Sequence, residues 1–304
     1  MQIKNTLSYI ILGTLGLISC TTPRTVTVTG KVTPRNQGTI GWNAALYVPT
    51  ATPKSIYKGA ESAIADYANK DTVIIDKVVI NSNKMLYAYS LDPLKYTNEI
   101  YGRFGVYDHV DVGYKYVYGT HVFDTRYQFL GSTNTHDKPS DEKFYGSIGI
   151  QYSQNKYELL SKYKINYLQD MMGYKFSRKD ILIPLAFSRS FGKEEKYGAI
   201  SFGAVYGHTF VKYSYLPIKT VKNAETKEDF KGLHAKQHYS SYGMFVTVKG
   251  GYRFIYAVVS LATYRQNYGD YILVNEQKFN MKGWTIIPSF GLQCYFGKGI
   301  LGKG

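Results

Sequence analysis

Residues 100–129 read IYGRFGVYDHVDVGYKYVYGTHVFDTRYQF and hold three short segments, at residues 100–106, 110–118 and 122–129, whose side chains alternate. One row of each segment is apolar or aromatic, as at Val112, Tyr114 and Tyr116, and the other row is polar. A period of two is typical of a β-strand whose faces meet unlike surroundings. The charged residues inside the segments all lie on the polar row: Arg103, Asp111, Lys115, Asp124 and Arg126.

Two architectures fit this alternation: a soluble sheet with the apolar row inward, or a membrane barrel with that row facing lipid. Segments of about nine to eleven residues, the length of a membrane-spanning strand, repeat along the chain. There are ten: residues 39–49, 100–106, 110–118, 122–129, 144–152, 181–189, 200–210, 242–249, 254–265 and 284–296. A hairpin at residues 72–80 and 85–91 would raise the count to twelve.

The connections favour the membrane barrel. Short links lie at residues 107–109, 192–196 and 250–252, whereas long polar connections lie at residues 50–96, 154–179, 214–239 and 266–282. Membrane barrels have short periplasmic turns and long outer loops. Glycine also recurs on the polar row, as at Gly105, Gly113 and Gly149, which indicates a crowded face such as the inside of a narrow barrel. The sequence therefore predicts an all-β, antiparallel up-and-down transmembrane β-barrel of about ten strands.

The N-terminus indicates export. Lys4 precedes an apolar run at residues 9–18, which is too short for a membrane-spanning helix and has the build of a secretory signal. Leu17-Ile18-Ser19-Cys20 then resembles the lipobox of bacterial lipoproteins. That resemblance implies cleavage before Cys20 by signal peptidase II and acylation of Cys20. An ordinary signal with a chance cysteine is the alternative. Only Cys294 would remain, so the mature chain cannot form an internal disulfide.

These features divide the chain into four parts. Residues 1–19 are expected to be the signal peptide, residues 20–38 a flexible lipidated tether, residues 39–297 the barrel and residues 298–304 a tail. Residues 56–68, within the first long connection, have the pattern of a short amphipathic helix. The expected location is the cell outer membrane, with a periplasmic, lipid-anchored N-terminus.

The last segment carries a second motif. Residues 289–296 read SFGLQCYF, with polar Ser289, then Gly291, and aromatic Phe296 at the end. This resembles the C-terminal assembly signal of outer-membrane barrels, and it implies recognition by the barrel assembly machinery. Members of that family usually end on the aromatic residue, whereas this chain continues to Gly304.

The formal net charge of +15 predicts anionic partners, either lipid phosphates or another anionic ligand. No basic run of five or six residues and no nucleic-acid fold signature occurs, so nucleic acid is not expected as a partner. His234 and His238 have the spacing of metal ligands on a helix, but no third ligand accompanies them. We find no Gly-x-Ser-x-Gly elbow, no Asp-x-His pair and no phosphate loop, so no enzyme, metal or cofactor is expected.

Charges inside a narrow barrel are costly unless they pair. The charged row therefore predicts a charge-paired plug, with a narrow polar conduit as the alternative. The predicted function is structural, or the binding of an outer-membrane lipid, an external protein or an anionic ligand through the long outer loops. Three alternatives remain: a small channel or transporter, a barrel hydrolase, and a soluble, lipid-anchored periplasmic barrel that binds an apolar ligand.

Overall fold

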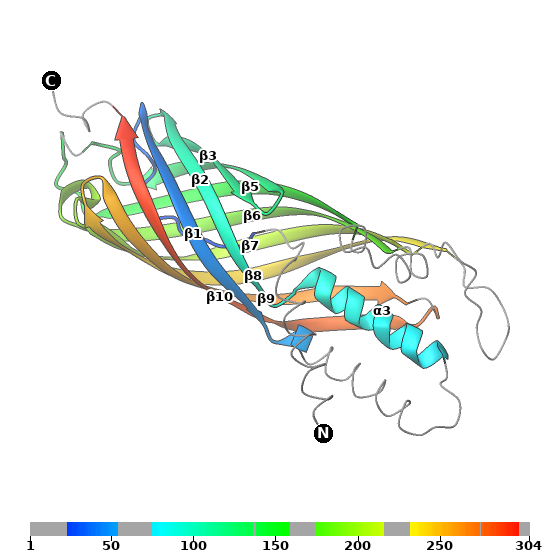
Figure 1. Ribbon diagram of the computed structural model, residues 1–304. Helices are drawn as coiled ribbons and strands as arrows, with labels where there is room; N and C mark the ends of the chain where they lie inside the picture. Colours follow the sequence, from blue (N-terminus) through cyan, green and yellow to red (C-terminus); the bar gives the residue numbers. More distant parts are fainter. Residues whose placement is uncertain are drawn as a thin grey trace, which may run out of the picture.

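The computed structural model describes residues 23–53, 75–135, 138–158, 174–215, 232–273 and 275–297. Within these residues, antiparallel strands form a closed barrel in which each strand pairs with its neighbour in sequence and β1 pairs with β10 (Figure 1). The strands are β1 (Gln37–Pro49), β2 (Lys95–Tyr107), β3 (Val110–Val117), β4 (Thr120–Leu130), β5 (Phe144–Glu158), β6 (Tyr174–Phe191), β7 (Gly198–Tyr215), β8 (Leu233–Tyr252), β9 (Ile255–Ile272) and β10 (Lys278–Gly297). The predicted all-β barrel of ten strands is confirmed.

The two ends of the barrel differ. At one end, which we call the turn side, β1 begins at Gln37 opposite Gly297, and the connections from β2 to β3, β4 to β5, β6 to β7 and β8 to β9 also lie there. At the other end, the loop side, β1 ends at Pro49 opposite Thr285. The loop side carries the long connections, together with one tight turn between β3 and β4 at Gly119.

The predicted apolar row lies on the outside of the barrel. Met244 is 70% exposed, Ile255 is 62% exposed and Ile148 is 42% exposed. We call this surface the outer belt; its large side chains include Ile40, Trp42, Ile100, Phe104, Val112, Tyr114, Phe123, Tyr127, Ile148, Ile150, Phe202, Tyr206, Met244, Val246, Val259, Leu261, Trp284, Ile286, Phe290 and Leu292. The architecture with the apolar row inward is wrong, because the lumen is too crowded for that row.

The surroundings of the glycines in the polar row show how crowded the lumen is. A Cβ atom at Gly149 would lie 2.9 Å from Cγ of Arg126, and one at Gly113 would lie 2.5 Å from a carboxylate oxygen of Asp124. At Gly105 it would overlap the carbonyl oxygen of Pro34. The expectation that glycine marks a crowded inner face is therefore confirmed.

The barrel wall is uneven. Strands β6 to β10 extend well past the outer belt on the loop side, into residues expected as loops at 154–179, 214–239 and 266–282. In this extension the rows exchange roles: Val211 and Tyr213 point inward and are buried, while Lys212 between them is exposed. For the described residues of these ranges that lie in strands, the prediction of loops is wrong, because only the outward row was expected to be apolar, whereas this part of the wall covers a helix.

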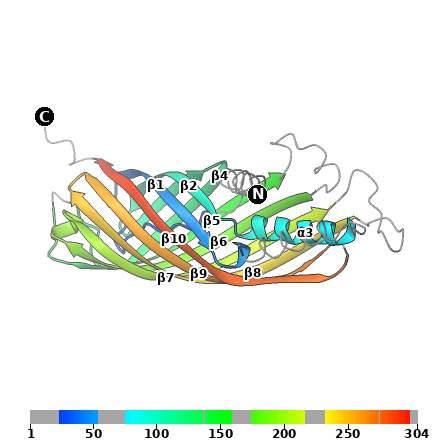
Figure 2. The same cartoon turned by 60° about the horizontal axis from the view of Figure 1, so that its bottom comes forward.

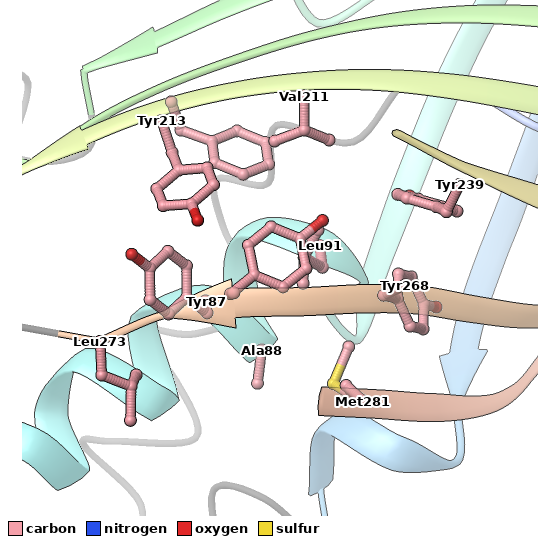
Figure 3. Close-up of a cluster of buried hydrophobic side chains, with 11 residues drawn as sticks. Tyr87, Ala88, Leu91, Val211, Tyr213, Tyr239, Tyr268, Leu273 and Met281 are labelled. Carbon is pink, nitrogen blue, oxygen red and sulfur yellow. The ribbon is translucent and has the colours of Figure 1, made fainter. Parts of the chain in front are cut away.

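That helix is α3 (Ile75–Leu91), which lies along the extended wall on the loop side (Figure 2). Tyr87, Ala88 and Leu91 share one helical face and are fully buried against side chains of β6 to β10 (Figure 3). The Tyr87 ring centroid lies 5.3 Å from those of both Tyr213 and Tyr271. The predicted hairpin is wrong here, since these residues follow a helical period. Residues 56–68 lie outside the described residues.

No helix among the described residues is both long and apolar enough to cross a membrane.

Residues 23–35 follow a different course from the flexible tether expected at residues 20–38. They lie inside the barrel, as the dark blue trace between the strands (Figure 1), and we call them the lumen strap. Thr25, Val32 and Thr33 of the strap are at most 4% exposed. The tether expectation is wrong for this part of the chain because the strap packs against the polar inner row.

Candidate functional site

The lumen strap has no regular secondary structure, so its backbone needs partners from the wall. Side chains of the wall accept hydrogen bonds from strap N–H groups, among them those of Gly30, Val32 and Thr33. The acceptors are Ser188 Oγ at 3.0 Å, Gln128 Oε1 at 2.9 Å and Asp111 Oδ2 at 2.8 Å, respectively. Side chains of the polar inner row thus form the hydrogen bonds that the backbone of a neighbouring strand would form in a sheet.

Wall side chains also donate to strap carbonyl oxygens. The donors named here come from β3, β4 and β9: Tyr264 OH to Arg24 at 2.7 Å, Lys115 Nζ to Thr25 at 3.1 Å, Ser260 Oγ to Val26 at 2.7 Å, and Arg126 Nη1 to Thr29 at 3.0 Å. The strap is therefore held along its whole length, and a solute could pass only by displacing it.

The predicted charge cluster lies beside the strap. Asp111, whose side chain is fully buried, accepts hydrogen bonds from Arg103 Nη1 at 3.0 Å and from Arg126 Nε at 3.1 Å. Arg126 Nη2 makes a further bond to the second carboxylate oxygen at 2.5 Å. Arg103 also pairs with Asp124. Four of the five predicted charges thus form one network, which joins β2, β3 and β4.

Lys115, the fifth predicted residue, belongs to a separate pair. Its ammonium lies 3.3 Å from a carboxylate oxygen of Glu99, and the Thr25 hydroxyl donates to the same carboxylate at 2.6 Å. Sequence reasoning missed Glu99, although it stands in the same polar row as Tyr101 and Arg103. The predicted segment began at residue 100, whereas β2 begins at Lys95 and includes Glu99.

Two further ion pairs close the turn side. Lys31 of the strap pairs with Glu194, and Lys249 of β8 pairs with Glu195. Both glutamates lie in the 3₁₀ turn η1 (Lys193–Glu195), and both have left-handed backbones, with φ of 54° and 59°. This conformation is unfavourable for residues other than glycine, so the turn stores strain to point both carboxylates inward. No sequence pattern marks this turn.

Charge governs the protonation of Glu195. Burial raises the pKa of its carboxyl group, but the Lys249 and Lys31 ammonium groups outweigh burial, so the pKa lies below its ordinary value. Glu195 is therefore ionised at neutral pH and forms a true ion pair.

Arg24 lies near the end of the strap that is on the loop side of the barrel. Its guanidinium donates to Gln266 and to Tyr239 OH, the latter at 3.1 Å, and lies 3.9 Å from Asp180. Asp180 in turn accepts two hydrogen bonds from Arg178, at 2.7 and 2.8 Å. Arg178 also donates to the carbonyl oxygen of Leu91, the last residue of α3, at 3.0 Å. One network therefore joins the strap, the wall and the helix.

Little space remains beside the strap. A cavity of about 60 Å³ is lined by strap residues, including Thr25 and Thr29, and by wall residues such as Arg103 and Lys249. One water needs about 10–15 Å³ of such volume, so the cavity has room for a few waters. It is far too small for a solute path.

A basic region lies on the outer face of the extended wall, just beyond the outer belt. We call it the basic rim: Lys179, His208, Lys212, Lys236, His238 and Arg265. Lys212 and Lys236 are direct cross-strand partners, an arrangement that is unfavourable without an anion. A hollow of about 260 Å³ is lined by Lys179, Lys212 and Phe210, among other residues. Among the described outward side chains of β6 to β8 in this region there is no carboxylate.

The remaining predicted residues do not gather at a site. Ser289, Gly291 and Phe296 lie along β10, with Ser289 inward and Phe296 outward and 49% exposed. Cys20 lies outside the described residues. His234 and His238 point outward from β8, not along a helix face. Across the described part of the chain, no group of three or more His, Cys, Asp or Glu side chains could hold a metal ion.

Comparison with solved structures finds weak likenesses to bacterial proteins. Ail, the attachment invasion locus protein of Yersinia pestis, solved with the heparin analogue sucrose octasulfate, is 8% identical with a TM-score of 0.34, over 86% of this chain and 99% of that chain. Neisserial surface protein A is 9% identical with a TM-score of 0.31, over 85% and 97%. A major outer membrane protein from Thermus thermophilus is 7% identical with a TM-score of 0.29, over 85% and 99%.

At these identities and TM-scores, the likenesses add nothing to the architecture that the strand pairing already establishes. No protein-family model matches the chain, and no curated protein sequence matches it.

Proposed function

We propose that this chain is a non-enzymatic outer-membrane β-barrel protein whose lumen is closed by its own lumen strap. It acts on the loop side, either as a structural protein or by binding a partner. The observation that carries the proposal is the burial of the strap across the lumen, from Arg24, which is 2% exposed, to Thr33, which is 4% exposed. A sealed barrel cannot conduct solutes, but it can display its loop side.

The outer belt supports the membrane location. It combines large, half-exposed apolar side chains with Trp42 and Trp284, and it surrounds the barrel. Soluble monomers rarely expose contiguous apolar patches beyond a few hundred Å². The soluble alternative also required an apolar ligand inside the barrel with the charged row in water. That arrangement is wrong, since Asp111 and Arg126 of that row are buried in the lumen.

A small channel is the second candidate, and one observation favours it: the strap is held by side chains and not by a sheet ladder. Its release would leave a lumen lined by polar groups. The cost is high, because Asp111, Glu99 and Glu194 would lose strap partners together. We therefore favour the closed barrel. Catalysis is not proposed, because the buried carboxylates described here are engaged in ion pairs or hydrogen bonds.

Two parts of the proposal rest on the motifs of the sequence. Acylation of Cys20 would add a lipid anchor, and one acyl chain binds membranes only weakly without a second element. Here the barrel supplies that second element. Ser289, Gly291 and Phe296 are proposed to be read by the barrel assembly machinery; β10 carries them on the strand that closes the barrel against β1.

The basic rim is the proposed site for an anionic partner, and we take this to be the phosphate groups of outer-leaflet lipid. The rim adjoins the outer belt, at the height where headgroups meet a barrel. Lys212→Gln with Lys236→Gln should lower the lipid phosphate retained by the detergent-purified protein. Lys138→Gln with Lys143→Gln, on exposed turn-side lysines, is the matched control. Equal retention by both double variants would contradict the site.

Extraction of membranes tests the proposed location. Outer-membrane fractions from cells that produce the wild-type chain or Cys20→Ala should be washed with carbonate and with urea. We expect both chains to stay in the membrane, because the outer belt holds the barrel without the acyl group. Complete release of an exported, folded Cys20→Ala chain would overturn the membrane-spanning barrel.

A further inference from the structure

Two connections on the turn side are tied to each other through their backbones. The connection between β6 and β7 includes Lys196 and Tyr197, and the connection between β8 and β9 includes Arg253. The Arg253 N–H group donates to the Lys196 carbonyl oxygen over 3.0 Å, and the Gly251 N–H group donates to the Tyr197 carbonyl oxygen over 3.1 Å. The Tyr256 hydroxyl donates to the same Lys196 oxygen over 3.2 Å. These bonds hold the two connections, and the side chains that they carry, in one arrangement.

Side chains at these connections form a cluster of two cations and two aromatic rings. The Lys196 ammonium nitrogen lies 5.5 Å from the centroid of the Tyr197 ring and 5.7 Å from that of the Tyr252 ring. The Arg253 guanidinium carbon lies 5.3 Å from the centroid of the Tyr252 ring, and the two ring centroids are 5.9 Å apart. Both cations therefore lie close to one ring, which is a favourable position for each of them. We call Lys196, Tyr197, Tyr252 and Arg253 the turn-side cluster.

The two cations of the turn-side cluster have no anionic partner in the described part of the chain. Carboxylates at this end of the barrel pair with other lysines: Glu194 with Lys31, Glu195 with Lys249, and Asp141 with Lys193. Neither Lys196 nor Arg253 forms an ion pair with a carboxylate among the described residues. Two cations that lie close to one ring repel each other, and an anion between them would offset this repulsion. The cluster is therefore complementary to a negatively charged group.

The turn-side cluster lies where the apolar outer surface ends. Val248 and Tyr252 share the outward row of β8 and are 43% and 54% exposed, and Tyr197 is 52% exposed. Apolar Ile255, which is 62% exposed, begins β9 opposite Tyr252. Tyrosine rings at the end of the apolar band of a membrane barrel mark the level of the lipid headgroups. The anionic groups that a lysine or an arginine meets at this level are lipid phosphates.

We propose that the turn-side cluster binds the headgroup of an anionic phospholipid in the leaflet that surrounds the turn side. The Lys196 ammonium and the Arg253 guanidinium donate to the non-bridging oxygens of the phosphate, and the acyl chains extend along the outer belt. A zwitterionic headgroup binds less tightly, because its ammonium meets two cations. Tyr252 is a positioning residue, since both cations lie against its ring. This inference rests on the proposed function only in requiring a membrane-spanning barrel, and it concerns the opposite end from the basic rim.

Lipid titration of the full chain tests this site. The detergent-solubilised protein is titrated with anionic phosphatidylglycerol or zwitterionic phosphatidylcholine, and native mass spectrometry counts the bound lipids. Lys196→Gln with Arg253→Gln should weaken the binding of one phosphatidylglycerol by about tenfold or more, because two charges that attract the headgroup are lost. Lys138→Gln with Lys143→Gln removes two exposed charges from the same end and should bind as the wild type does. Tyr252→Leu keeps every charge and should also weaken binding, because the cations lose the ring that positions them.

A further variant and a competitor identify the ligand and the place where it binds. Lys212→Gln with Lys236→Gln alters only the basic rim, so it should keep the lipid that the turn-side variant loses. Inorganic phosphate at the concentration of the lipid should not displace phosphatidylglycerol, because it lacks the acyl chains that the outer belt contacts. Displacement by inorganic phosphate would assign the cluster to a free anion and would overturn the lipid site.

The remaining outcomes separate this inference from the proposed function. Equal phosphatidylglycerol binding by the turn-side and the control double variants, both folded by circular dichroism, would overturn the site while leaving a membrane-spanning barrel intact. Equal affinity of the wild type for phosphatidylglycerol and phosphatidylcholine would also overturn it. Release of the folded wild-type chain from membranes by carbonate would instead overturn the proposed function. If the turn-side double variant does not fold, Tyr252→Leu decides, and unchanged binding by that variant would contradict the cluster.

Discussion

Thr33 donates its backbone N–H to a carboxylate oxygen of Asp111 over 2.8 Å. The other oxygen of that carboxylate accepts hydrogen bonds from Arg103 and Arg126. The predicted charge cluster therefore does more than pair charges within the wall, because Asp111, Arg126 and Lys115 also bind the strap directly. The polar inner row, whose alternation with the apolar row predicted the fold, therefore also provides the groups that hold the lumen strap.

Asp111→Asn should destabilise the barrel by about 3–5 kcal/mol, because Arg103 and Arg126 would lose a shared anion in a buried site. Urea unfolding followed by the fluorescence of Trp42 and Trp284 measures this. Asp141→Asn is the control: Asp141 pairs with Lys193 on the surface, so we expect no measurable change. Equal midpoints for Asp111→Asn and the wild type would contradict the buried network.

Gly30→Ala should displace the strap. A Cβ atom there would overlap the Tyr145 carbonyl oxygen and lie 2.9 Å from the Ser188 backbone nitrogen, and neither backbone atom can yield cheaply. We expect trypsin to cut faster at Arg24, Lys31 and Arg35. Gly250→Ala is the matched control, because a Cβ atom at Gly250 meets nothing within 4 Å. If both variants resist trypsin as well as the wild type does, the strap is not packed as described.

Ile148→Arg should destabilise the membrane-inserted barrel by about 2–4 kcal/mol, the cost of a cation near the bilayer midplane. Ile148 lies in the β5 part of the outer belt, with 42% of its surface exposed. Asn267→Arg, on the outward row of β9 beyond the belt, should change stability by less than about 0.5 kcal/mol. Unfolding in lipid vesicles compares the two. Indifference to both changes would count against a lipid-facing belt.

The contribution of Glu195 to stability should depend on pH. Its pKa is lower in the folded chain than in the unfolded chain, so the ion pair stabilises fully above the unfolded value of 4.5 and the gain is lost as pH falls through the folded pKa. Glu195→Gln should thus lower stability between about pH 6 and 8, and the difference from wild type should shrink below pH 4.5. A difference that stays constant across this range would argue against an ionised Glu195.

Much of the fold was predictable because the outer and inner rows differ sharply in chemistry. Val112, Tyr114 and Tyr116 alternate with Asp111, Gly113 and Lys115. A β-strand places these two sets of residues on opposite faces. The pattern fails in the extension of β6 to β10. There the inner face covers α3 and the outer face meets water, so apolar residues such as Tyr213 exchange sides.

The charge cluster was predictable in part for the same reason. Arg103, Asp111, Asp124 and Arg126 lie on the polar rows of adjacent strands, so their meeting follows from antiparallel pairing. Glu194 and Glu195 could not be found, because their role depends on a strained turn. The strap left a weak signal: Thr25, Thr27 and Thr29 alternate with Val26 and Val28, a strand-like period in a stretch expected to be flexible.

The central claim is that the lumen strap seals the barrel, and conductance across a planar lipid bilayer tests it most directly. The purified wild-type chain should insert and give no steady conductance, since the cavity beside the strap measures about 60 Å³. Gly30→Ala, which loosens the strap, should give openings under the same voltage. Steady conductance from the folded wild-type chain would contradict the account and make the channel the better description of this protein.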